Sequence, residues 1–497
     1  MPEPSGELLL GIDLGSSGVK AVLLDPERGL VASSSRTVDL FSEHPGWSEA
    51  DPAEWWLAVC HLIPELFVQS GTSRENVAAL AVTGMVPAVL LLDAKGQPLR
   101  RAILQNDARA TKEIDEIRES LGDFDILSRT GSVLSQQSLA PSARWLARHE
   151  PDVWSSTASI QGSYDWLARR LGAEPHVEEN WALESGLYDM ALQPLERVLA
   201  ASDVAWPSLL DVKGPGDVIG EVSSDAAQAT GLRSGTPIVV GGADHVLSAF
   251  GAGLFDQGDC LIKLGGAGDI LAVSDEVFLD ARLYLDKHPV PGKWLPNGCM
   301  ATSGSLLRWE QAIFNDVPLD ELDAAAAKSA PGSLLTLPYF LGEKTPLHDP
   351  DLRGVMIGLH LGTTRGDIHR SFLEAIAYGF RSHFEVFADD GLLLGSTRVT
   401  NGGSKSRLWR EILADVLNRD LISIVAHPGA SYGAAVVAGV GTGKIADWSY
   451  VVGSLEVGEI ISPNPYHVAL YEERYHEFLQ LNDATASLSH LLARSSQ

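Results

Sequence analysis

Two segments about half the chain apart share one layout, and this repeat constrains the fold more than any other feature. Each is an apolar run ending in Leu-Gly, then a turn of small residues, then a second apolar run; they are Leu8 to Leu24 and Cys260 to Val273. This layout is typical of a β-hairpin. Coincidence is the alternative, because short glycine-rich hairpins are common. We interpret the repeat as a duplicated fold of two similar α/β domains, each opening with such a hairpin.

Length and composition fit large domains and exclude several kinds of partner. The chain has 497 residues, of which 45% are hydrophobic and 21% charged, so it can bury extensive cores. Its net charge of −28 argues against nucleic acid and anionic membranes as partners, because both require a basic surface. The three cysteines are far apart and form no CxxC pair, so neither a disulfide framework nor a structural zinc site is expected.

The N-terminus and the apolar runs predict a cytoplasmic protein. Residues 1–7 lack the basic start and long apolar run of a signal peptide. Apolar runs such as Val86 to Leu92 have the length of strands, well short of the roughly 18 residues of a membrane span. Outside the hairpins, strands are predicted at 77–83, 88–92, 237–241, 397–400 and 421–425, and helices at 52–67, 109–121, 140–149, 163–171, 246–253, 406–417 and 464–494.

The first hairpin is a candidate phosphate site. Asp13 ends its first strand, and the turn from Gly15 to Gly18 offers backbone donors that can approach phosphate oxygens. Ser16 and Ser17 can add hydroxyl donors. Asp13 could then hold Mg²⁺, which usually keeps waters and takes one or two carboxylates. A plain hairpin turn with solvated serines is the alternative.

Two further glycine-rich turns are candidates for contact with a polyphosphate or a flat ligand. Gly265 and Gly266 begin the turn of the second hairpin, and Gly402 and Gly403 lie between a predicted strand and a predicted helix. A glycine turn into a helix N-terminus suits close approach of an anionic ligand. A turn that requires positive φ explains Gly402 and Gly403 equally well.

One carboxylate could perform proton transfer. Asp244 follows the predicted strand 237–241 near the middle of the chain, where it could take a proton from a substrate hydroxyl. Aspartate is also a common N-cap, and the helix expected from Val246 would give it that role. Both interpretations stay open on this pattern alone.

Two motifs point elsewhere. Ala438 to Ile445 resembles a P-loop, but alanine replaces its first glycine and isoleucine replaces the magnesium-binding hydroxyl, so we interpret it as a helix C-terminus. Gly429 to Gly433 matches a nucleophile elbow around Ser431, and Asp447 with His467 or His476 could complete a serine hydrolase. Too little chain remains after Ser431 for the rest of such a sheet, and tight packing of small residues is the alternative.

Together the segments resemble the FGGY carbohydrate kinases, near the xylulokinases. The resemblance covers nearly the whole chain and rests on Gly11 to Lys20, Gly241 to Asp244, Pro338 to Pro346, Asn401 to Ser406 and, most specifically, Gly354 to Glu374. It implies two ribonuclease-H-like domains of the actin-like ATPase class around a deep catalytic cleft. Residues 1–247 would carry the sugar site, the first phosphate loop and the catalytic aspartate, and residues 248–497 the nucleotide site.

The resemblance also implies a reaction and a set of site residues. The reaction is ATP- and Mg²⁺-dependent phosphorylation of a small sugar or polyol, with a five-carbon ketose or its polyol favoured; the resemblance also allows a homodimer. Asp244 would be the general base, and Asp13 would lie near the metal. The other nucleotide contacts implied are Gly15, Ser16, Ser17 and Lys20 at the terminal phosphates, Gly265 and Gly266 in the second phosphate loop, and Gly304, Gly402, Gly403 and Ser404 towards the nucleoside.

The departures from the family pattern concentrate in the acceptor pocket. A histidine of xylulokinase-like members is Pro87 here, a tryptophan is Gln105, and the asparagine after the catalytic aspartate is His245. The pocket predicted on this basis consists of Met85, Val86, Pro87, Gln105, Asp244 and His245. Because this pocket matches no acceptor type, a nucleotide-gated sugar-binding protein with weak catalysis is a further alternative.

Overall fold

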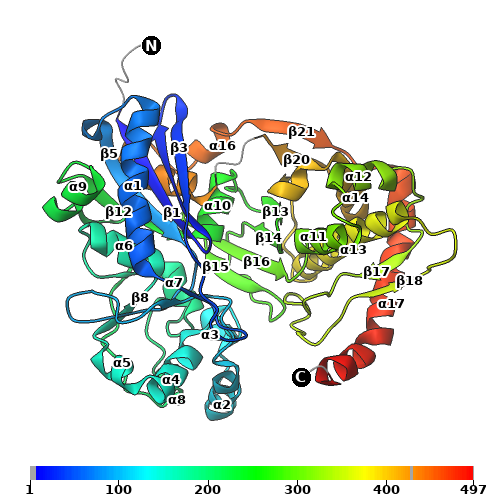
Figure 1. Cartoon of the computed structure of the whole chain (residues 1–497), viewed down its shortest axis with the longest axis horizontal. Coiled ribbons are helices and arrows are strands. Elements are labelled where there is room, and N and C mark those ends of the chain that lie inside the picture. The colour runs from blue at the N-terminus through cyan, green and yellow to red at the C-terminus, as the bar shows by residue number, and fades with distance from the viewer. Residues whose placement is uncertain (1–6, 426–428, 496–497) are drawn as a thin grey trace. The chain divides into compact units, whose positions relative to one another are not determined.

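The computed structural model describes residues 7–425 and 429–495, which form two compact units (Figure 1). The first unit takes in the described residues of Met1–Phe255, Leu285–Trp294 and Pro428–Ser454. The second takes in those of Asp256–Tyr284, Leu295–His427 and Leu455–Gln497. Each unit is therefore assembled from segments that are distant in sequence.

The first unit is built on a sheet with the strand order β11-β12-β5-β1-β2-β3. Strands β12, β5 and β1 run parallel, whereas β2, β3 and β11 pair antiparallel with their neighbours. The bounds are Leu8–Gly15 for β1, Gly18–Asp25 for β2, Gly29–Thr37 for β3, Val77–Gly84 for β5, Val218–Glu221 for β11 and Pro237–Ala243 for β12.

The three parallel strands end at one edge of this sheet. Thr83 of β5 pairs with Asp13 of β1 on one side and with Gly242 of β12 on the other. Gly84 continues both pairings, with Leu14 and Ala243. Carboxyl ends of parallel strands are where open α/β sheets place their ligands, so this edge is the first place to look for a site.

Helix α15 (Ala430–Gly441) packs closely on β1. A Cβ atom on Gly11 would lie only 1.8 Å from the Ser431 carbonyl oxygen, so the strand and the helix approach to a distance that only glycine permits. Apolar residues of the strands and of α15 form the core here, among them Leu9, Ala81 and Val436. The segment 428–454 thus belongs to the first unit because its apolar helix covers that sheet.

The long connection between β5 and β12 carries most of the remaining elements of the first unit. The elements within this connection are Leu90–Leu92 (β6), Ala102–Ile103 (β7), Thr111–Leu121 (α2), Leu127–Thr130 (α3), Leu139–His149 (α4), Pro151–Ser156 (α5), Ser159–Gln161 (β8), Ser163–Leu171 (α6), Val177–Glu178 (β9), Glu179–Glu184 (α7), Glu196–Ala201 (α8), Val212–Lys213 (β10) and Ser224–Thr230 (α9). Elements outside it are β4 (Glu49–Ala50), α1 (Pro52–Ser70), α10 (Asp244–Gly251) and α16 (Tyr450–Gly453).

The second unit repeats the strand order of the first. Strands β20, β19 and β13 run parallel, and β14 and β16 follow antiparallel, as β12, β5, β1, β2 and β3 do in the first unit. The bounds are Cys260–Leu264 for β13, Gly268–Ala272 for β14, Trp294–Met300 for β16, Thr397–Thr400 for β19, Leu421–Ile424 for β20 and Val457–Ile461 for the edge strand β21. This shared order confirms the duplicated fold predicted from the two hairpins.

Helices complete the second unit around an apolar core that includes Ile262, Phe380 and Trp409. Their bounds are Gly304–Ile313 (α11), Leu319–Ala326 (α12), Arg365–Asp389 (α13), Arg407–Leu417 (α14) and Pro465–Ser495 (α17). A small pair of strands, Leu335–Leu337 (β17) and Val355–Ile357 (β18), lies beside α13. Strand β15 spans Tyr284–Lys287, and its residues from Leu285 on belong to the first unit. None of the helices described in the structure is long and apolar enough to cross a bilayer.

Candidate active site

The edge at which β1, β5 and β12 end brings three predicted segments together. Asp13 lies near the end of β1, Met85 to Pro87 follow β5, and Asp244 follows β12. Because neighbouring strands lie about 4.8 Å apart, the backbones of Asp13 and Asp244 are separated by roughly two strand spacings, with the Met85 segment between them. The Met85 N–H donates to the Leu14 carbonyl at 3.1 Å and so extends the pairing of β5 with β1.

The first hairpin closes with a two-residue turn. Gly15 pairs with Gly18, and Ser16 and Ser17, which form the turn, are exposed to solvent. Asp13 and Lys20 face each other as cross-strand partners and are both half-buried. An exposed turn of small residues beside a carboxylate and an ammonium group is chemically suited to a magnesium-bound phosphate.

Asp244 is the first residue of α10 and does not cap it. Ala243 occupies the N-cap position, and the Asp244 Oδ1 atom accepts from the backbone N–H of His245 at 2.6 Å. The N-cap interpretation of Asp244 is therefore wrong, because β12 continues to Ala243 and the helix begins earlier than predicted. The Asp244 side chain retains 35% of its exposure, so a substrate hydroxyl can reach it.

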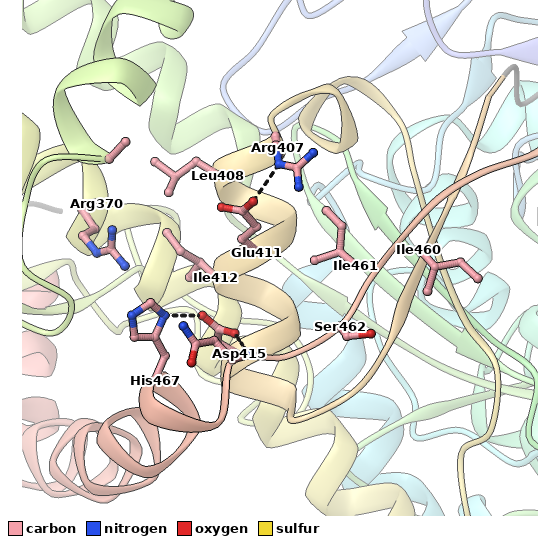
Figure 2. A pocket seen from close by; sticks show the side chains of 12 residues that line it. Arg370, Arg407, Leu408, Glu411, Ile412, Asp415, Ile460, Ile461, Ser462 and His467 are labelled. Atoms are coloured by element: carbon pink, nitrogen blue, oxygen red, sulfur yellow. Dashed lines mark hydrogen bonds and ion pairs between the residues drawn. The ribbon is translucent and has the colours of Figure 1, made fainter.

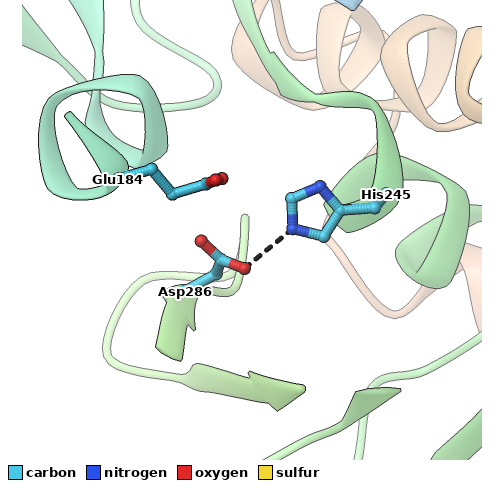
Figure 3. A group of neighbouring side chains, drawn as sticks. All are labelled: Glu184, His245 and Asp286. Carbon is cyan, nitrogen blue, oxygen red and sulfur yellow. Dashed lines mark hydrogen bonds and ion pairs between the residues drawn. The ribbon is translucent and has the colours of Figure 1, made fainter. Parts of the chain in front are cut away.

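His245 belongs to a cluster with two acidic residues that the sequence patterns missed (Figure 3). Its Nε2 atom lies 2.7 Å from Oδ2 of Asp286, and its Nδ1 atom lies 3.6 Å from Oδ1 of Asp244. Burial alone would lower the pKa of His245, but the carboxylates of Asp286, Asp244 and Glu184 outweigh it and raise the pKa well above its usual range. His245 is therefore an imidazolium at neutral pH.

Glu184, at the end of α7, is the third member of this cluster. Burial raises the pKa of its carboxyl well above the usual range, and the nearby charge of Asp286 raises it further. One ligand atom from each of Glu184, His245 and Asp286 lies within 4.8 Å of the others, a spacing that a cation could use. Two members of the cluster, His245 and Asp286, are joined by a hydrogen bond.

The predicted acceptor residues after β5 are buried and held by their backbone. The Met85 carbonyl accepts from Ser163 Oγ at 3.3 Å, and the Ala88 carbonyl accepts from Trp181 Nε1 at 2.9 Å. Pro87, between them, offers no side-chain donor or acceptor.

Gln105 lies in the loop after β7, and its buried Oε1 atom has no hydrogen-bond partner among the described residues. The structure shows no hydrogen bond that joins the described side chain of Gln105 to Asp244 or His245. Buried polar atoms are usually satisfied, so Gln105 has an acceptor available for a ligand.

In the second unit, the start of α11 packs on the turn of the second hairpin. The N–H of Gly304 donates to the Gly265 carbonyl at 2.8 Å, and the N–H groups of Ser303 and Ser305 donate to the Gly266 carbonyl at 2.9 and 3.0 Å. A Cβ atom on Gly304 would lie 2.6 Å from the Gly265 carbonyl oxygen, so only glycine allows this contact. The predicted residues Gly265, Gly266 and Gly304 are thus brought together.

Gly402, Gly403 and Ser404 lie in a short 3₁₀ segment after β19. Positive φ falls on Asn401, at 71°, so the alternative that these glycines serve a positive-φ turn is wrong. A Cβ atom on Gly403 would lie 2.4 Å from the Trp409 ring, whereas one on Gly402 would meet no atom within 4 Å. Gly403 is therefore required for packing, and Gly402 faces open space.

Three buried hydroxyls beside this turn have no hydrogen-bond partner among the described residues. They belong to Thr302, Ser303 and Ser305, at the start of α11. Buried hydroxyls are normally satisfied, so three together indicate a polar ligand. These hydroxyls and the open space at Gly402 fit a nucleotide, although serine and threonine in a loop gave no signal in the sequence.

The serine hydrolase alternative has no support in the structure. Ser431 is fully buried, and its Oγ atom has no hydrogen-bond partner among the described residues, so no base activates it. His467 pairs with Asp415 at 2.8 Å instead, in a cavity of about 470 Å³ that includes none of the predicted kinase residues (Figure 2). Helix α15 ends at Gly441, within the P-loop-like segment, which confirms the interpretation of this segment as a helix C-terminus.

Comparisons with known proteins give the family. Residues 8–251 match the N-terminal domain of the FGGY family of carbohydrate kinases, and residues 276–442 match its C-terminal domain. The chain belongs to this family and is a carbohydrate kinase, as its motifs predicted.

Individual relatives resemble the chain over nearly its whole length. Xylulose kinase of Staphylococcus epidermidis is 30% identical over 97% of this chain and 98% of its own. L-xylulose/3-keto-L-gulonate kinase of Escherichia coli is 27% identical over 95% and 96%. The crystal structure of xylulose kinase from Rhodospirillum rubrum superposes with a TM-score of 0.91 at 38% identity, covering 97% of this chain and 100% of that one. These comparisons support neither the hydrolase nor the non-catalytic alternative.

Proposed function

We propose that this kinase transfers the terminal phosphoryl group of ATP to a hydroxyl of a five-carbon ketose or its polyol. The observation that carries the proposal is the shared edge of β1, β5 and β12. Asp13, the Met85 segment and Asp244 lie side by side there, and we assign them the roles of metal contact, acceptor contact and base. The names of the relatives favour a ketose as the acceptor.

Asp244 is the general base in this proposal. Phosphoryl transfer depends mainly on positioning and on neutralising charge, and a carboxylate receives the hydroxyl proton as the new oxygen–phosphorus bond forms. Asp244 suits this role because it is partly exposed and because its Oδ1 atom is fixed by the N–H of His245.

The nucleotide and its metal would be held by the remaining predicted residues. Mg²⁺ beside Asp13, when bound, neutralises charge on the phosphates. Gly15, Ser16, Ser17 and Lys20 would bind the terminal phosphates from residues 1–247. Residues 248–497 would bind the rest of the nucleotide through Gly265, Gly266, Gly304, Gly402, Gly403 and Ser404, with Thr302, Ser303 and Ser305 as added hydroxyl donors.

The test is acceptor-dependent ADP release from ATP and Mg²⁺ across ketoses and polyols of four to six carbons. We expect at least one five-carbon acceptor to stimulate ADP release far above the rate without acceptor. If acceptors bind, as judged by a thermal shift, yet none stimulates ADP release, the chain is a binding protein and the proposal is wrong. Asp244→Asn is the control for contaminating kinase activity.

A further inference from the structure

We propose that Asp286 determines acceptor specificity: it fixes His245 beside Asp244 and pairs with its positive charge, so that acceptors that carry a carboxylate are disfavoured. The inference rests on the proposed function, in which Asp244 is the base that contacts the acceptor. Asp286 is a positioning residue, since it acts on the acceptor through the imidazole ring of His245. The cluster lies within the first unit and joins α7, β15 and α10 (Figure 3).

Exposure is graded across the cluster. The side chain of Asp286 is 2% exposed, that of His245 is 23% exposed and that of Asp244 is 35% exposed. The carboxylate of Asp286 is therefore the most deeply buried of the three groups, and the proposed base, Asp244, is the most accessible to solvent. Because Nε2 of His245 bonds to Asp286 at 2.7 Å, the ring cannot turn, and Nδ1 stays 3.6 Å from Asp244.

Asp286 is itself held in place by the residue that follows it. The N–H of Lys287 donates to Oδ1 of Asn180 at 2.7 Å, and Nδ2 of Asn180 donates to the Lys287 carbonyl at 3.0 Å. Two hydrogen bonds between one amide side chain and one backbone unit fix both position and direction. Asn180 and Glu184 lie on the same helix, α7, so this helix positions both acidic partners of His245.

The charges of the cluster disfavour an anionic acceptor. Asp286 already uses the positive charge of His245, and the other predicted acceptor residues, Met85, Val86, Pro87 and Gln105, carry no charge. The nearby ammonium of Lys287 is paired with Glu179 at 3.0 Å. A carboxylate-bearing acceptor would therefore meet the acidic groups of Asp244 and Asp286 without an unpaired cation among these residues.

The same cluster should bind a neutral polyhydroxy acceptor well, because its groups can form hydrogen bonds with hydroxyls. Carboxylate and imidazole groups are good partners for hydroxyls, and hydrogen bonds to charged groups are stronger than those between neutral ones. Uncompensated like charges at this range reduce affinity by on the order of 100-fold. The cluster should thus distinguish a ketose from the keto acid of the same length, a discrimination that matters because one relative bears the name of a keto acid, 3-keto-L-gulonate.

The experiment compares kcat/KM for a neutral ketose with kcat/KM for sugar acids of matched length, including 3-keto-L-gulonate. The wild type should prefer the neutral acceptor at least 100-fold. Asp286→Asn should reduce this preference at least tenfold, chiefly by lowering KM for the acid, because the positive charge of His245 is then no longer paired. Asp286→Asn should also raise KM for the neutral acceptor, because the ring of His245 is released.

Asp225→Asn is the control, since it removes an exposed negative charge outside the cluster, and it should leave the preference unchanged. The inference is overturned if the wild type uses acids as well as ketoses, or if folded Asp286→Asn keeps the full preference. Should Asp286→Asn fail to fold, Asn180→Ala decides the question, because it removes the two hydrogen bonds that hold the backbone beside Asp286 and should also reduce the preference. Absence of ADP release with every acceptor would instead overturn the proposed function.

Discussion

The backbone N–H of His245 donates a hydrogen bond to the Oδ1 atom of Asp244 at 2.6 Å, although the two residues are adjacent in sequence. This contact fixes the orientation of the Asp244 carboxylate at the start of α10. The N-cap of this helix is Ala243, so Asp244 does not serve as its cap. Asparagine keeps an oxygen at the same position, so it can preserve the contact while losing basicity. The role of Asp244 can therefore be tested with little change in shape.

Asp244→Asn should lower kcat by about 10² to 10⁴, the usual loss when a general base is removed. ATP affinity should stay within a few-fold, because Asp244 is not among the proposed nucleotide contacts. Steady-state kinetics and ATP titration measure the two effects. Asp225→Asn, on the exposed face of α9, is the control and should leave both kcat and ATP affinity unchanged. Near-normal turnover in Asp244→Asn would show that the base is another residue.

The two glycines after Asn401 should respond differently to alanine. Gly402→Ala adds a methyl group to open space, so stability should not change, but the KM for ATP should rise on the order of tenfold if the nucleotide occupies that space. Gly403→Ala forces a methyl group against Trp409 and should lower the free energy of unfolding by about 1–3 kcal/mol. Thermal unfolding and ATP titration distinguish them; an unchanged KM in Gly402→Ala would remove this turn from the nucleotide site.

The sequence predicted the residues that follow strands better than those that meet by tertiary packing. Asp13 and Asp244 were found because an apolar run stops at each, and that change in pattern is local. The two hairpins were found for the same reason, and their duplication then predicted the matching sheets. Strand pairing explains why these local signals suffice, since parallel neighbours must end at the same edge.

Glu184 and Asp286 could not be found in this way. They are about a hundred residues apart and reach His245 only through the packing of α7, β15 and α10. Each is a single acidic residue within a mixed segment, a pattern that surface residues share. The start of α10 was missed for a related reason: Asp244 is a favourable N-cap residue, and only the extent of β12 shows that Ala243 takes that position.

Ser431→Ala should keep kinase activity within a few-fold. The Ser431 hydroxyl is buried and has no hydrogen-bond partner among the described residues, so its removal should leave the free energy of unfolding unchanged or slightly higher. Urea unfolding and ADP release measure the two outcomes. A fluorophosphonate probe should not label the wild type at Ser431. Labelling there, or loss of all catalysis in a folded variant, would restore the hydrolase hypothesis.

His369 should make the stability of the second unit depend on pH. Its ring is buried and bonds to Glu310 at 2.6 Å and to Asp323 at 3.0 Å. Burial alone would lower the pKa of His369, but these two hydrogen bonds raise it from 6.5 to about 9. A histidine whose pKa is higher in the folded state than in the unfolded state stabilises the folded protein fully at pH values below its unfolded-state pKa. That contribution is lost as the pH rises through the folded value.

The free energy of unfolding should therefore decrease between about pH 6.5 and 9, by at most roughly 3 kcal/mol from this group. His369→Gln should be less stable than the wild type at pH 6 and should lose less stability by pH 9.5. Urea unfolding at both pH values checks this, with His476→Gln as the control, because His476 is exposed. Equal pH dependence in the wild type and His369→Gln would contradict the assignment.

The last prediction concerns the acceptor itself and depends on Pro87 and His245. In xylulokinase-like proteins the position of Pro87 is a histidine that binds a sugar hydroxyl, and proline cannot replace that hydrogen bond. A hydroxyl buried without a partner costs about 1–3 kcal/mol, or about one to two decades in affinity. D-xylulose should therefore be a poor acceptor, and another ketose or polyol should have a much higher kcat/KM. His245→Ala should raise KM for the acceptor more than KM for ATP. If D-xylulose proves the best acceptor of a broad panel, the role given to Pro87 is wrong, because Pro87 then does not occupy the position of that histidine.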